Sequence, residues 1–319
     1  MCGIVGYSGP KEPLPILING LSRLEYRGYD SAGIAISDGS KITIEKKEGK
    51  LNVLKDHLKN NPVSGNLGIG HTRWATHGVP NDVNAHPHSD NGGEFAIIHN
   101  GIIENYAEIK KDLLEEGFEF KSDTDTEVVA VELSRKWNGE LLKTVVDVAK
   151  TLDGTYALVV TTTKEEGTIV AGRLMSPLVL GVGDNEVFLA SDSAAILEHT
   201  KKMIFLENGD FVEIKNGQYK LFDSDLNEIE REIQEIDWEV SEAEKAGYDH
   251  FMYKEILEQP EVIERTISGR LETTSEEIPI KLDQASKYEK IWIVACGTAY
   301  HAGLFGKDLF EKVLGVPVS

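Results

Sequence analysis

Met1-Cys2-Gly3-Ile4-Val5-Gly6 opens the chain, and the cysteine in second place governs how the rest is interpreted. Because the Cys2 side chain is small, we expect Met1 to be removed, which makes Cys2 the N-terminal residue. A free α-amino group has an ordinary pKa of about 7.7–8.0 and can act as a base near neutral pH. An amine beside its own thiol combines a nucleophile and a base in one residue. Taken alone, however, Met1-Cys2 is better explained as an ordinary small hydrophobic residue on a first strand.

The composition indicates a globular protein with more than one domain. The 319 residues are 40% hydrophobic and 27% charged, with a formal net charge of -21. A chain with this much negative charge repels the phosphate backbone of DNA or RNA, so we expect no nucleic-acid partner. No apolar run approaches the roughly 20 residues that span a membrane, and the N-terminus lacks a signal peptide. Cys2 and Cys296 lie far apart without CxxC spacing, so we predict a cytoplasmic protein without disulfides or a zinc knuckle.

Apolar spacing and turn residues divide the first part of the chain into short elements. They predict helices over 14–24, 51–58, 105–116, 126–137 and 141–152. They predict strands over 3–6, 34–36, 42–45, 66–70, 95–98, 156–162, 168–171, 178–182, 186–190, 211–214 and 219–222. Thr124 and Glu127 have the spacing of a capping box. Because strands and helices come in blocks, we predict an α+β domain over 1–238, with antiparallel sheets covered by helices.

The last part of the chain has a different pattern. Residues 223–250 are charged and low in β-branched side chains, and we place a linker at 239–250. A helix is predicted from Phe251 to Leu271 despite Pro260, then a buried-type strand over Lys290–Ala295, then another helix. This is the first βα unit of a parallel sheet, and a domain of that kind needs on the order of 100 residues. We therefore predict that 251–319 is an incomplete α/β domain.

Polar residues gather where three of these elements end or begin. They are His71-Thr72-Arg73-Trp74-Ala75-Thr76-His77-Gly78, His99-Asn100-Gly101 and Thr124-Asp125-Thr126-Glu127. Each has a plain structural explanation: Asn100-Gly101 is a common turn dipeptide, and Asp125 suits helix capping, as do Asp123 and Thr124. Five of the nine histidines fall between 71 and 99, but no HExxH or similar spacing organises them. We expect neither metal nor cofactor, and interpret His99 as a buried core histidine.

In their order and separation, these segments and Cys2-Gly3-Ile4-Val5-Gly6 together resemble the N-terminal-nucleophile glutamine amidotransferases. The resemblance implies a four-layer αββα sandwich over 1–238. It also implies hydrolysis of the glutamine side-chain amide, with Cys2 as nucleophile and its α-amino group as base. The Asn100 side chain and the Gly101 N–H would then form an oxyanion hole, a kind of site in which one donor is worth on the order of 10²–10³ in rate.

The same resemblance assigns the glutamine-binding residues. Arg73 would bind the α-carboxylate, as a planar fork meeting a planar group, and Asp125 would accept the α-ammonium. Thr76, His77 and Gly78 would line the pocket, with His86 supporting it from behind. Trp74 resembles a gate on the path that ammonia takes, where a bulky ring can exclude water.

Two further segments resemble the branch of this superfamily that converts fructose 6-phosphate to glucosamine 6-phosphate. They are Leu24-Glu25-Tyr26-Arg27-Gly28-Tyr29-Asp30-Ser31-Ala32-Gly33 and Ala295-Cys296-Gly297-Thr298-Ala299-Tyr300. The second is similar to the start of a sugar isomerase domain. Cys296, Gly297, Thr298 and Ala299 would form part of its sugar-phosphate site, with Ala299 where the family often has serine.

The other synthase residues lie further along in that branch, so these 319 residues alone are expected to hydrolyse glutamine without making the amino sugar. The resemblance also suggests a homodimer formed largely through that further half. Three alternatives remain: an amidotransferase that delivers ammonia to phosphoribosyl pyrophosphate or aspartate, a stand-alone glutaminase fragment, and a non-catalytic sensor of glutamine or a sugar phosphate.

Overall fold

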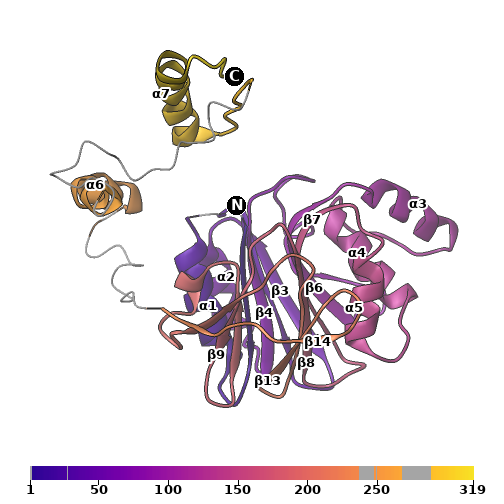
Figure 1. Cartoon of the computed structure of the whole chain (residues 1–319). Helices are drawn as coiled ribbons and strands as arrows, with labels where there is room; N and C mark the ends of the chain where they lie inside the picture. Colours follow the sequence, from indigo (N-terminus) through magenta and orange to yellow (C-terminus); the bar gives the residue numbers. More distant parts are fainter. Residues whose placement is uncertain (1, 27, 237–247, 249, 268–288) are drawn as a thin grey trace. The chain divides into compact units, whose positions relative to one another are not determined.

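A computed structural model describes residues 2–26, 28–236, 248, 250–267 and 289–319 (Figure 1). The chain divides into two compact units, Met1–Glu244 and Lys245–Ser319. The linker predicted over 239–250 falls almost wholly outside the described residues, as does the predicted helix beyond Ile267.

Two antiparallel sheets form the first unit. The strand order in the first is β15-β11-β9-β10-β1-β4-β2-β3, and in the second β14-β13-β12-β8-β7-β6-β5. The first sheet consists of β1 (Gly3–Ser8), β2 (Ser31–Ser37), β3 (Ile42–Glu48), β4 (Leu67–Arg73), β9 (Val179–Val182), β10 (Val187–Ala190), β11 (Lys202–Phe205) and β15 (Gln234–Glu235). The second consists of β5 (His88–Ser89), β6 (Phe95–Ile103), β7 (Gly154–Thr162), β8 (Thr168–Leu174), β12 (Phe211–Lys215), β13 (Gln218–Phe222) and β14 (Glu228–Ile229).

Helices cover the outer face of each sheet, as Figure 1 shows. The first sheet is covered by α1 (Pro13–Leu24) and α2 (Leu51–Asn60), beside the short 3-10 helix η1 (Ser193–Ala195). The second is covered by α4 (Asp125–Arg135) and α5 (Leu141–Ala149), with α3 (Tyr106–Glu115) packed against α4. The layers are thus helix, sheet, sheet, helix, and the predicted αββα sandwich is confirmed.

Strand alternation divides the apolar side chains between three cores. On β1, Ile4 belongs to the core between the sheets, whereas Val5 and Tyr7 pack beneath the helices. Burying a side chain of this size stabilises the fold by roughly 1.5–3 kcal/mol. On β4 the helix-facing positions include Gly68 and Gly70, where a Cβ would lie 2.9 Å from Leu17 Cδ1 and 3.0 Å from Leu21 Cδ1. These glycines let α1 approach the sheet closely.

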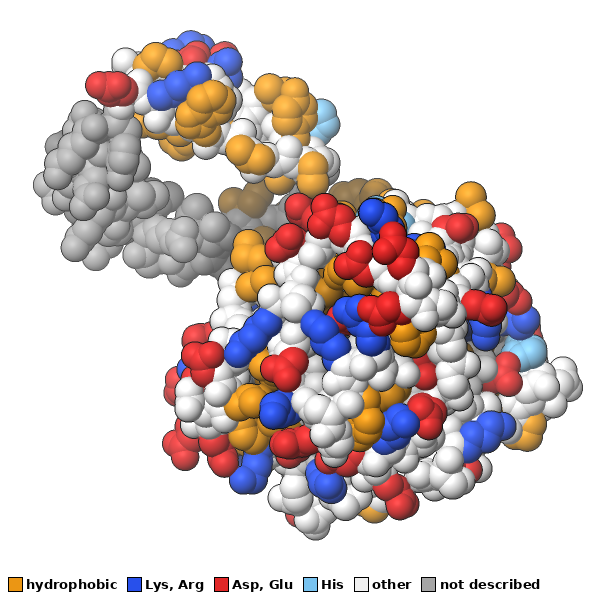
Figure 2. Space-filling view, turned by 90° about the vertical axis from the view of Figure 1, so that its right-hand side faces the viewer, with side chains coloured by type: hydrophobic (Ala, Val, Ile, Leu, Met, Phe, Trp, Pro, Cys, Tyr) orange, Lys and Arg blue, Asp and Glu red, His pale blue; other side chains and the backbone are white. Residues whose placement is uncertain are grey.

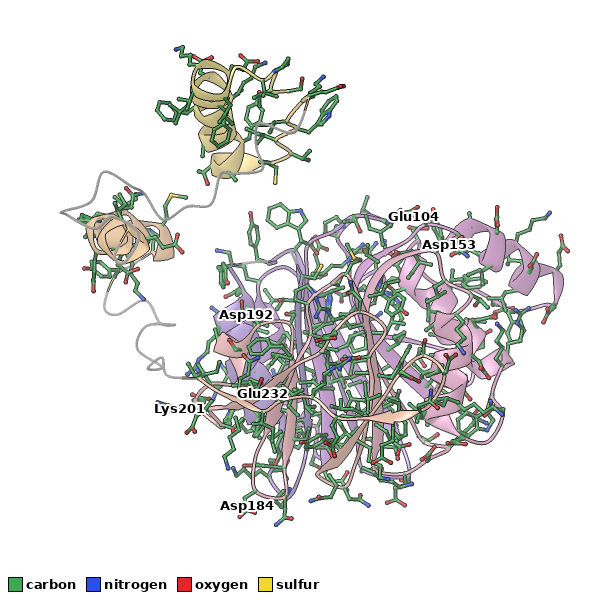
Figure 3. The ribbon with its side chains drawn as sticks, viewed as in Figure 1. Glu104, Asp153, Asp184, Asp192, Lys201 and Glu232 are labelled. Atoms are coloured by element: carbon green, nitrogen blue, oxygen red, sulfur yellow. The ribbon has the colours of Figure 1, made fainter. Side chains whose placement is uncertain are left out.

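Different residues mark the two ends of the sandwich. Glu104, directly after β6, and Asp153 lie at one edge, and Asp184 in the β9–β10 turn marks the opposite one (Figure 3). The Glu104 N–H donates to the Asp153 carbonyl at 2.8 Å. β1 begins at this same edge, because Asn100 near the end of β6 donates from Nδ2 to the Cys2 carbonyl at 3.1 Å.

Most of the predicted helices and strands of this unit are present, but the two-residue strands β5, β14 and β15 were not predicted, and there are further differences. Strand β6 runs on through Asn100-Gly101 to Ile103 and pairs with β7, so the turn interpretation of that dipeptide is wrong. Strand β11 was not predicted either, because it has only four residues and the residues at its two ends are exposed. Thr124 Oγ1 does accept from the Glu127 N–H, at 3.3 Å. The Glu127 carboxylate, however, accepts from the Lys121 and Ser122 N–H groups, so the capping box is only half formed.

The second unit contains α6 (Phe251–Ile267), which includes Pro260, and α7 (Gly297–Leu314). The strand predicted over Lys290–Ala295 is formed only in part, as a parallel bridge between Ile291 and Val318. The Ile291 N–H donates to the Pro317 carbonyl at 2.9 Å, the Ser319 N–H to the Ile291 carbonyl at 3.0 Å, and the Ile293 N–H to the Ser319 carbonyl at 2.8 Å. Trp292 and Val294 are 69% and 94% exposed. A parallel strand needs a neighbour along its whole length, and residues 317–319 pair with the backbone of Ile291 and Ile293 but not with the rest of the segment.

The surface of the first unit mixes both signs of charge despite the net charge of -21. Figure 2 shows acidic and basic side chains interspersed over the face formed by α3, α4 and α5. Arg135 on α4, for example, lies 2.6 Å from Glu116 and 2.7 Å from Glu132. Within the described ranges, the helices are all too short or too polar to cross a bilayer.

Candidate active site

Cys2 directly precedes β1, a central strand of the first sheet, and its sulfur contacts the backbone of Trp74. The Trp74 N–H donates to Cys2 Sγ at 3.2 Å, and the thiol lies 3.6 Å from the Trp74 carbonyl. The register of β1 on β4, which pairs Gly3 with Thr72, brings these residues together. Burial raises the pKa of the Cys2 thiol, and the Trp74 N–H opposes that shift. Since the thiol is therefore protonated at neutral pH, attack by its sulfur requires a nearby base.

A small cavity, about 20 Å³ in volume, lies beside Cys2. Its lining comes from distant parts of the chain and consists of Cys2, Arg73, Trp74, Thr76, His86, His99, Gly101, Thr124, Asp125 and Thr126. The sequence-based interpretation had named Cys2, Arg73, Trp74, Thr76, His86, Gly101 and Asp125 for one site, and the structure brings them together.

Arg73 ends β4 on the face that looks toward the second sheet. Its Nη2 donates to the carbonyls of His77 and Gly78 and so folds the segment after Trp74 back over the strand end. Its Nη1 is buried and has no hydrogen-bond partner. Gly78 has a φ of +75°, and a Cβ there would lie 2.6 Å from Asn84 Nδ2, so this turn requires glycine.

Asn100 and Gly101 lie side by side on β6. Asn100 follows Ala96 and Ile98 on the face toward the first sheet, and its Nδ2 contacts the Cys2 carbonyl. Gly101 has a φ of +138°, and a Cβ there would lie 1.9 Å from the Thr155 carbonyl oxygen. Glycine is therefore the residue that lets β6 remain paired with β7 at this point.

Asp125 begins α4 but does not cap it. The cap is Thr124, whereas Asp125 Oδ2 accepts from the Ile103 N–H at 2.8 Å and the side chain is only 4% exposed. The capping interpretation of Asp125 is wrong, and its carboxylate faces the Cys2 cavity.

Trp74 lines the cavity and borders solvent, whereas His77 lies outside the lining. The Trp74 ring is 51% exposed and meets Tyr29 edge-on, with ring centroids 5.7 Å apart. His77 contributes its carbonyl to Arg73, while its ring packs edge-on against Tyr106 at 5.3 Å.

Four histidines are buried at the cavity: His86 and His99 line it, and His71 and His88 lie next to His86. The His71 and His86 rings stack at 4.3 Å, and His86 meets His88 at 4.7 Å. His86 Nε2 and His99 Nδ1 each lie 2.9 Å from Thr126 Oγ1. Burial lowers the pKa of all four, that of His71 to about 3, so they are neutral at pH 7. Among the described residues, no three His, Cys, Asp or Glu side chains are grouped to hold a metal.

Three residues at the site, His71, Thr124 and Thr126, were not predicted as site residues from the sequence. His99 was interpreted only as a core residue. The sequence did contain a signal for His71. Every second residue of a strand lies on the same face, and on β4 these residues are Leu67, Ile69, His71 and Arg73. Asn100 shares the opposing face of β6 with Ala96 and Ile98, which places the two side chains across from each other.

In the described part of the chain, Cys296, Gly297, Thr298 and Ala299 are all exposed and do not line the cavity found in this unit. Cys296 is exposed and precedes α7, whose first residue Gly297 has a φ of +60°. A cavity of about 70 Å³ in this unit is lined instead by Ile293, Ala295, Tyr300, Gly303, Leu304, Lys307 and Ser319.

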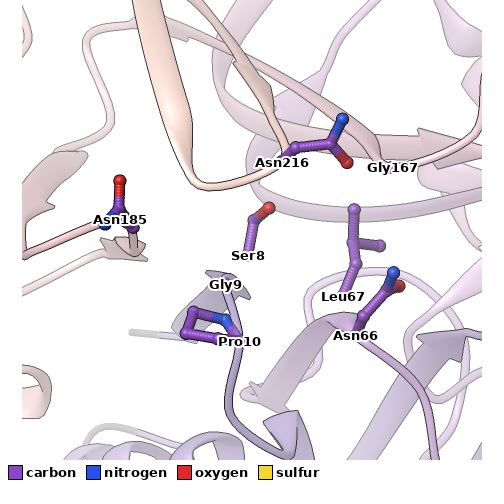
Figure 4. Close-up of a pocket in the computed structure, with 8 residues that line it drawn as sticks. All are labelled: Ser8, Gly9, Pro10, Asn66, Leu67, Gly167, Asn185 and Asn216. Atoms are coloured by element: carbon purple, nitrogen blue, oxygen red, sulfur yellow. The ribbon is translucent and has the colours of Figure 1, made fainter.

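A larger cavity, about 350 Å³ in volume, lies at the other end of β1 (Figure 4). It is lined by Ser8, Gly9, Pro10, Asn66, Leu67, Gly167, Asn185 and Asn216. None of these side chains ionises, and Asn185 and Asn216 adopt the positive φ of turn residues. Its lining therefore offers no base that could activate the Ser8 hydroxyl, in contrast to the nucleophile–base pair proposed for Cys2.

Two solved structures share the sandwich. They are glutamine phosphoribosylpyrophosphate amidotransferase from B. subtilis, complexed with ADP and GMP (TM-score 0.63, 28% identity), and an allosteric regulatory enzyme of purine biosynthesis (TM-score 0.62, 29% identity). Each match covers 71% of this chain and 50% of the other. The fold is thus that of the N-terminal-nucleophile amidotransferases, as the resemblance in the sequence implied.

The chain belongs to the glutamine amidotransferase domain family, whose profile matches residues 56–250. It is 48% identical to a glutamine–fructose-6-phosphate aminotransferase (isomerizing) of Clostridium perfringens and 49% identical to one of Fusobacterium nucleatum. Another, of Aquifex aeolicus, is 46% identical. These matches cover 99–100% of this chain but 53% of each relative, so the chain spans about half the length of these relatives.

Proposed function

We propose that this chain hydrolyses the side-chain amide of glutamine, with Cys2 as the nucleophile and the ammonia passed to a sugar-phosphate acceptor. The observation that carries the proposal is the buried, unpartnered Nη1 of Arg73, a residue that lines the cavity together with Cys2 and Asp125. An uncompensated buried guanidinium nitrogen costs free energy unless an anion completes its hydrogen bonds. The α-carboxylate of an amino acid fits it, with Asp125 accepting from the α-ammonium.

The reaction follows from the groups at the cavity. With Met1 removed, the Cys2 α-amino group takes the thiol proton while Sγ bonds to the amide carbon of glutamine. Negative charge develops on the amide oxygen, where Asn100 Nδ2 and the Gly101 N–H stabilise it. The carbon–nitrogen bond then breaks, and the leaving nitrogen takes the proton from the α-ammonium and departs as ammonia. Water attacks the resulting thioester, which releases glutamate and restores the thiol.

Glutamine must displace part of the cavity wall to bind. A volume of about 20 Å³ holds no more than one water molecule, whose share of liquid volume is about 30 Å³. The exposed Trp74 ring and the segment that Arg73 holds through His77 and Gly78 form the wall that borders solvent. We infer that this segment, Trp74–Gly78, moves outward to admit glutamine.

Fructose 6-phosphate is the acceptor we propose, within a longer enzyme. The support is identity of 46–49% along essentially the whole chain to glutamine–fructose-6-phosphate aminotransferases, against 28% to the phosphoribosylpyrophosphate enzyme. In that proposal residues 1–238 are the glutaminase domain. Residues 251–319 begin a sugar isomerase domain whose sugar-phosphate site includes Cys296, Gly297, Thr298 and Ala299. A cytoplasmic location and a homodimer formed through the further half belong to the same proposal.

The test is an assay of the purified chain with glutamine and fructose 6-phosphate, measuring glutamate, ammonia and glucosamine 6-phosphate. We expect glutamate and ammonia in equal amounts from the wild type, no turnover from Cys2→Ala, and no amino sugar from these 319 residues alone. Ser8→Ala is the control, since Ser8 is the last residue of β1 and lies at the end of that strand away from Cys2. Unchanged turnover by Cys2→Ala would remove the proposed mechanism.

The base is tested separately. A lysine inserted between Met1 and Cys2 keeps the thiol but prevents its residue from carrying the free α-amino group. We expect this variant to lose glutamine hydrolysis, and the intact mass of the active wild type to show that Met1 is absent. Full activity with Met1 still attached would contradict the assignment of the α-amino group as base.

A further inference from the structure

His71 lies directly behind the amide that faces Cys2. Its ring is fully buried on β4, at 0% exposure, and stacks on His86. Its Nε2 lies 3.0 Å from Asn100 Oδ1 and 3.1 Å from the His99 carbonyl oxygen. Its Nδ1 is buried without a hydrogen-bond partner. The catalytic chemistry described above makes no use of this histidine.

The backbone decides which nitrogen of His71 carries the proton. A carbonyl oxygen only accepts hydrogen bonds, so Nε2, which lies between the His99 carbonyl and Asn100, must be the donor. A neutral ring has one proton, which leaves Nδ1 bare, in agreement with its lack of a partner. If Nε2 carries the proton, the Asn100 atom that faces it must be the oxygen Oδ1. An NH₂ group in that place would put two hydrogen-bond donors against each other.

The orientation of the Asn100 amide is therefore set from behind. With Oδ1 held by His71, Nδ2 must point toward Cys2, and it donates to the Cys2 carbonyl at 3.1 Å. An amide nitrogen has two hydrogens, so one remains for the oxygen of a reacting amide. If the amide were reversed, Oδ1 would face the Cys2 carbonyl oxygen and no Nδ2 donor would be available.

We propose that His71, as its Nε2–H tautomer, is a positioning residue that fixes the Asn100 side chain as an oxyanion-hole donor. The proposal rests on the proposed glutaminase function, because it assigns the oxygen that Asn100 Nδ2 stabilises. It predicts an effect on the chemical step and not on glutamine binding, since Arg73 and Asp125 hold the amino-acid end.

The kinetic test compares two substitutions at one position. His71→Leu fills a similar volume without a donor, whereas His71→Gln carries an NH₂ group that can reach the place of Nε2. For glutamine hydrolysis we expect kcat of His71→Leu to fall roughly tenfold to a hundredfold, below the 10²–10³ known for losing an oxyanion donor. KM should stay within about threefold. His71→Gln should recover most of kcat.

His88→Leu is the matched control, because His88 is another buried histidine of the same cluster and its Nε2 contacts Thr124 Oγ1 instead of Asn100. We expect it to lose thermal stability like His71→Leu while keeping kcat within about threefold. An equal fall of kcat in His88→Leu, or a His71→Gln variant no better than His71→Leu, would show a packing role only and overturn the proposal.

A second measurement needs no active variant. In ¹⁵N-histidine-labelled wild type, assigned by difference from His71→Gln, His71 should give the neutral Nε2–H tautomer from pH 6 to 8. An Nδ1–H tautomer or a charged ring would refute the positioning role even if glutamine is hydrolysed. Failure of the wild type to hydrolyse glutamine would instead remove the proposed function and leave the tautomer result standing.

Discussion

At the scale of single residues, Arg73 connects the substrate cavity to the segment that closes it. One guanidinium nitrogen, Nη2, donates to the His77 and Gly78 carbonyls, while Nη1 has no partner among the described residues. A planar guanidinium can make both sets of contacts at once, because its donors form a rigid fork. Lysine has a single ammonium group and cannot replace both.

We therefore predict that Arg73→Lys weakens glutamine binding more than it slows the chemistry. Hydrogen bonds to charged groups contribute about 1.5–3 kcal/mol, so KM should rise roughly tenfold to a hundredfold. Steady-state glutaminase kinetics measure this. Arg135→Lys on α4, where the arginine pairs with surface glutamates, should leave KM unchanged. A normal KM for Arg73→Lys would argue against carboxylate binding by Arg73.

At the scale of elements, strand β6 carries much of the site. It continues for nine residues, Phe95–Ile103, and places Asn100 and Gly101 within a paired strand instead of a turn. A paired strand holds side chains more firmly than a turn does, which suits a donor that must meet developing charge. The pairing depends on Gly101, because any Cβ would strike the Thr155 carbonyl of β7.

Gly101→Ala is accordingly expected to break this end of the β6–β7 pair. We predict a loss of roughly 2–4 kcal/mol in the free energy of unfolding, together with loss of glutamine hydrolysis. Gly93→Ala is the matched control: it also has a positive φ, +70°, but nothing lies within 4 Å of its Cβ. That variant should lose only about 1–2 kcal/mol and stay active. Urea unfolding compares the two, and equal losses would contradict the steric argument.

At the scale of the whole sandwich, closing the layers buries four neutral histidines at one active site. Burial lowers the pKa of each below its ordinary value of about 6.5, with mutual repulsion adding to the effect on His86. The unfolded chain binds protons on these residues at pH values where the folded protein does not. Stability is therefore fully present above about pH 7 and falls as the pH drops through 6.5.

We predict that the free energy of unfolding decreases between pH 7 and 5.5, with a slope approaching about 1.4 kcal/mol per pH unit for each buried histidine. Urea unfolding at a series of pH values measures the slope. His88→Gln should make this slope shallower by up to about 1.4 kcal/mol per pH unit, the contribution of one histidine. A free energy that stays constant over this range would mean that these histidines bind protons equally in the folded and the unfolded protein, so that burial does not lower their pKa.

The sequence by itself determined the class of fold, most of the helices and strands of the first unit, and the residues around Cys2. It could do so because apolar periodicity is local, and because the spacing of the Cys2, Arg73, Asn100 and Asp125 segments resembles a known family. It was only partly right about the Lys290–Ala295 strand, since a strand forms only where a neighbouring strand pairs with it, and, among the described residues, 317–319 pair with Ile291 and Ile293 alone.

Only the tertiary structure decided how individual polar atoms are shared. Local patterns assign Asn100-Gly101 to a turn and Asp125 to a cap. The pairing of β6 with β7 and the Ile103 N–H instead turn them toward Cys2. The link from the His99 carbonyl through His71 to Asn100 spans two sheets. Hydrogen bonds depend on distances of a few ångströms between residues far apart in the chain, and local periodicity does not encode those distances.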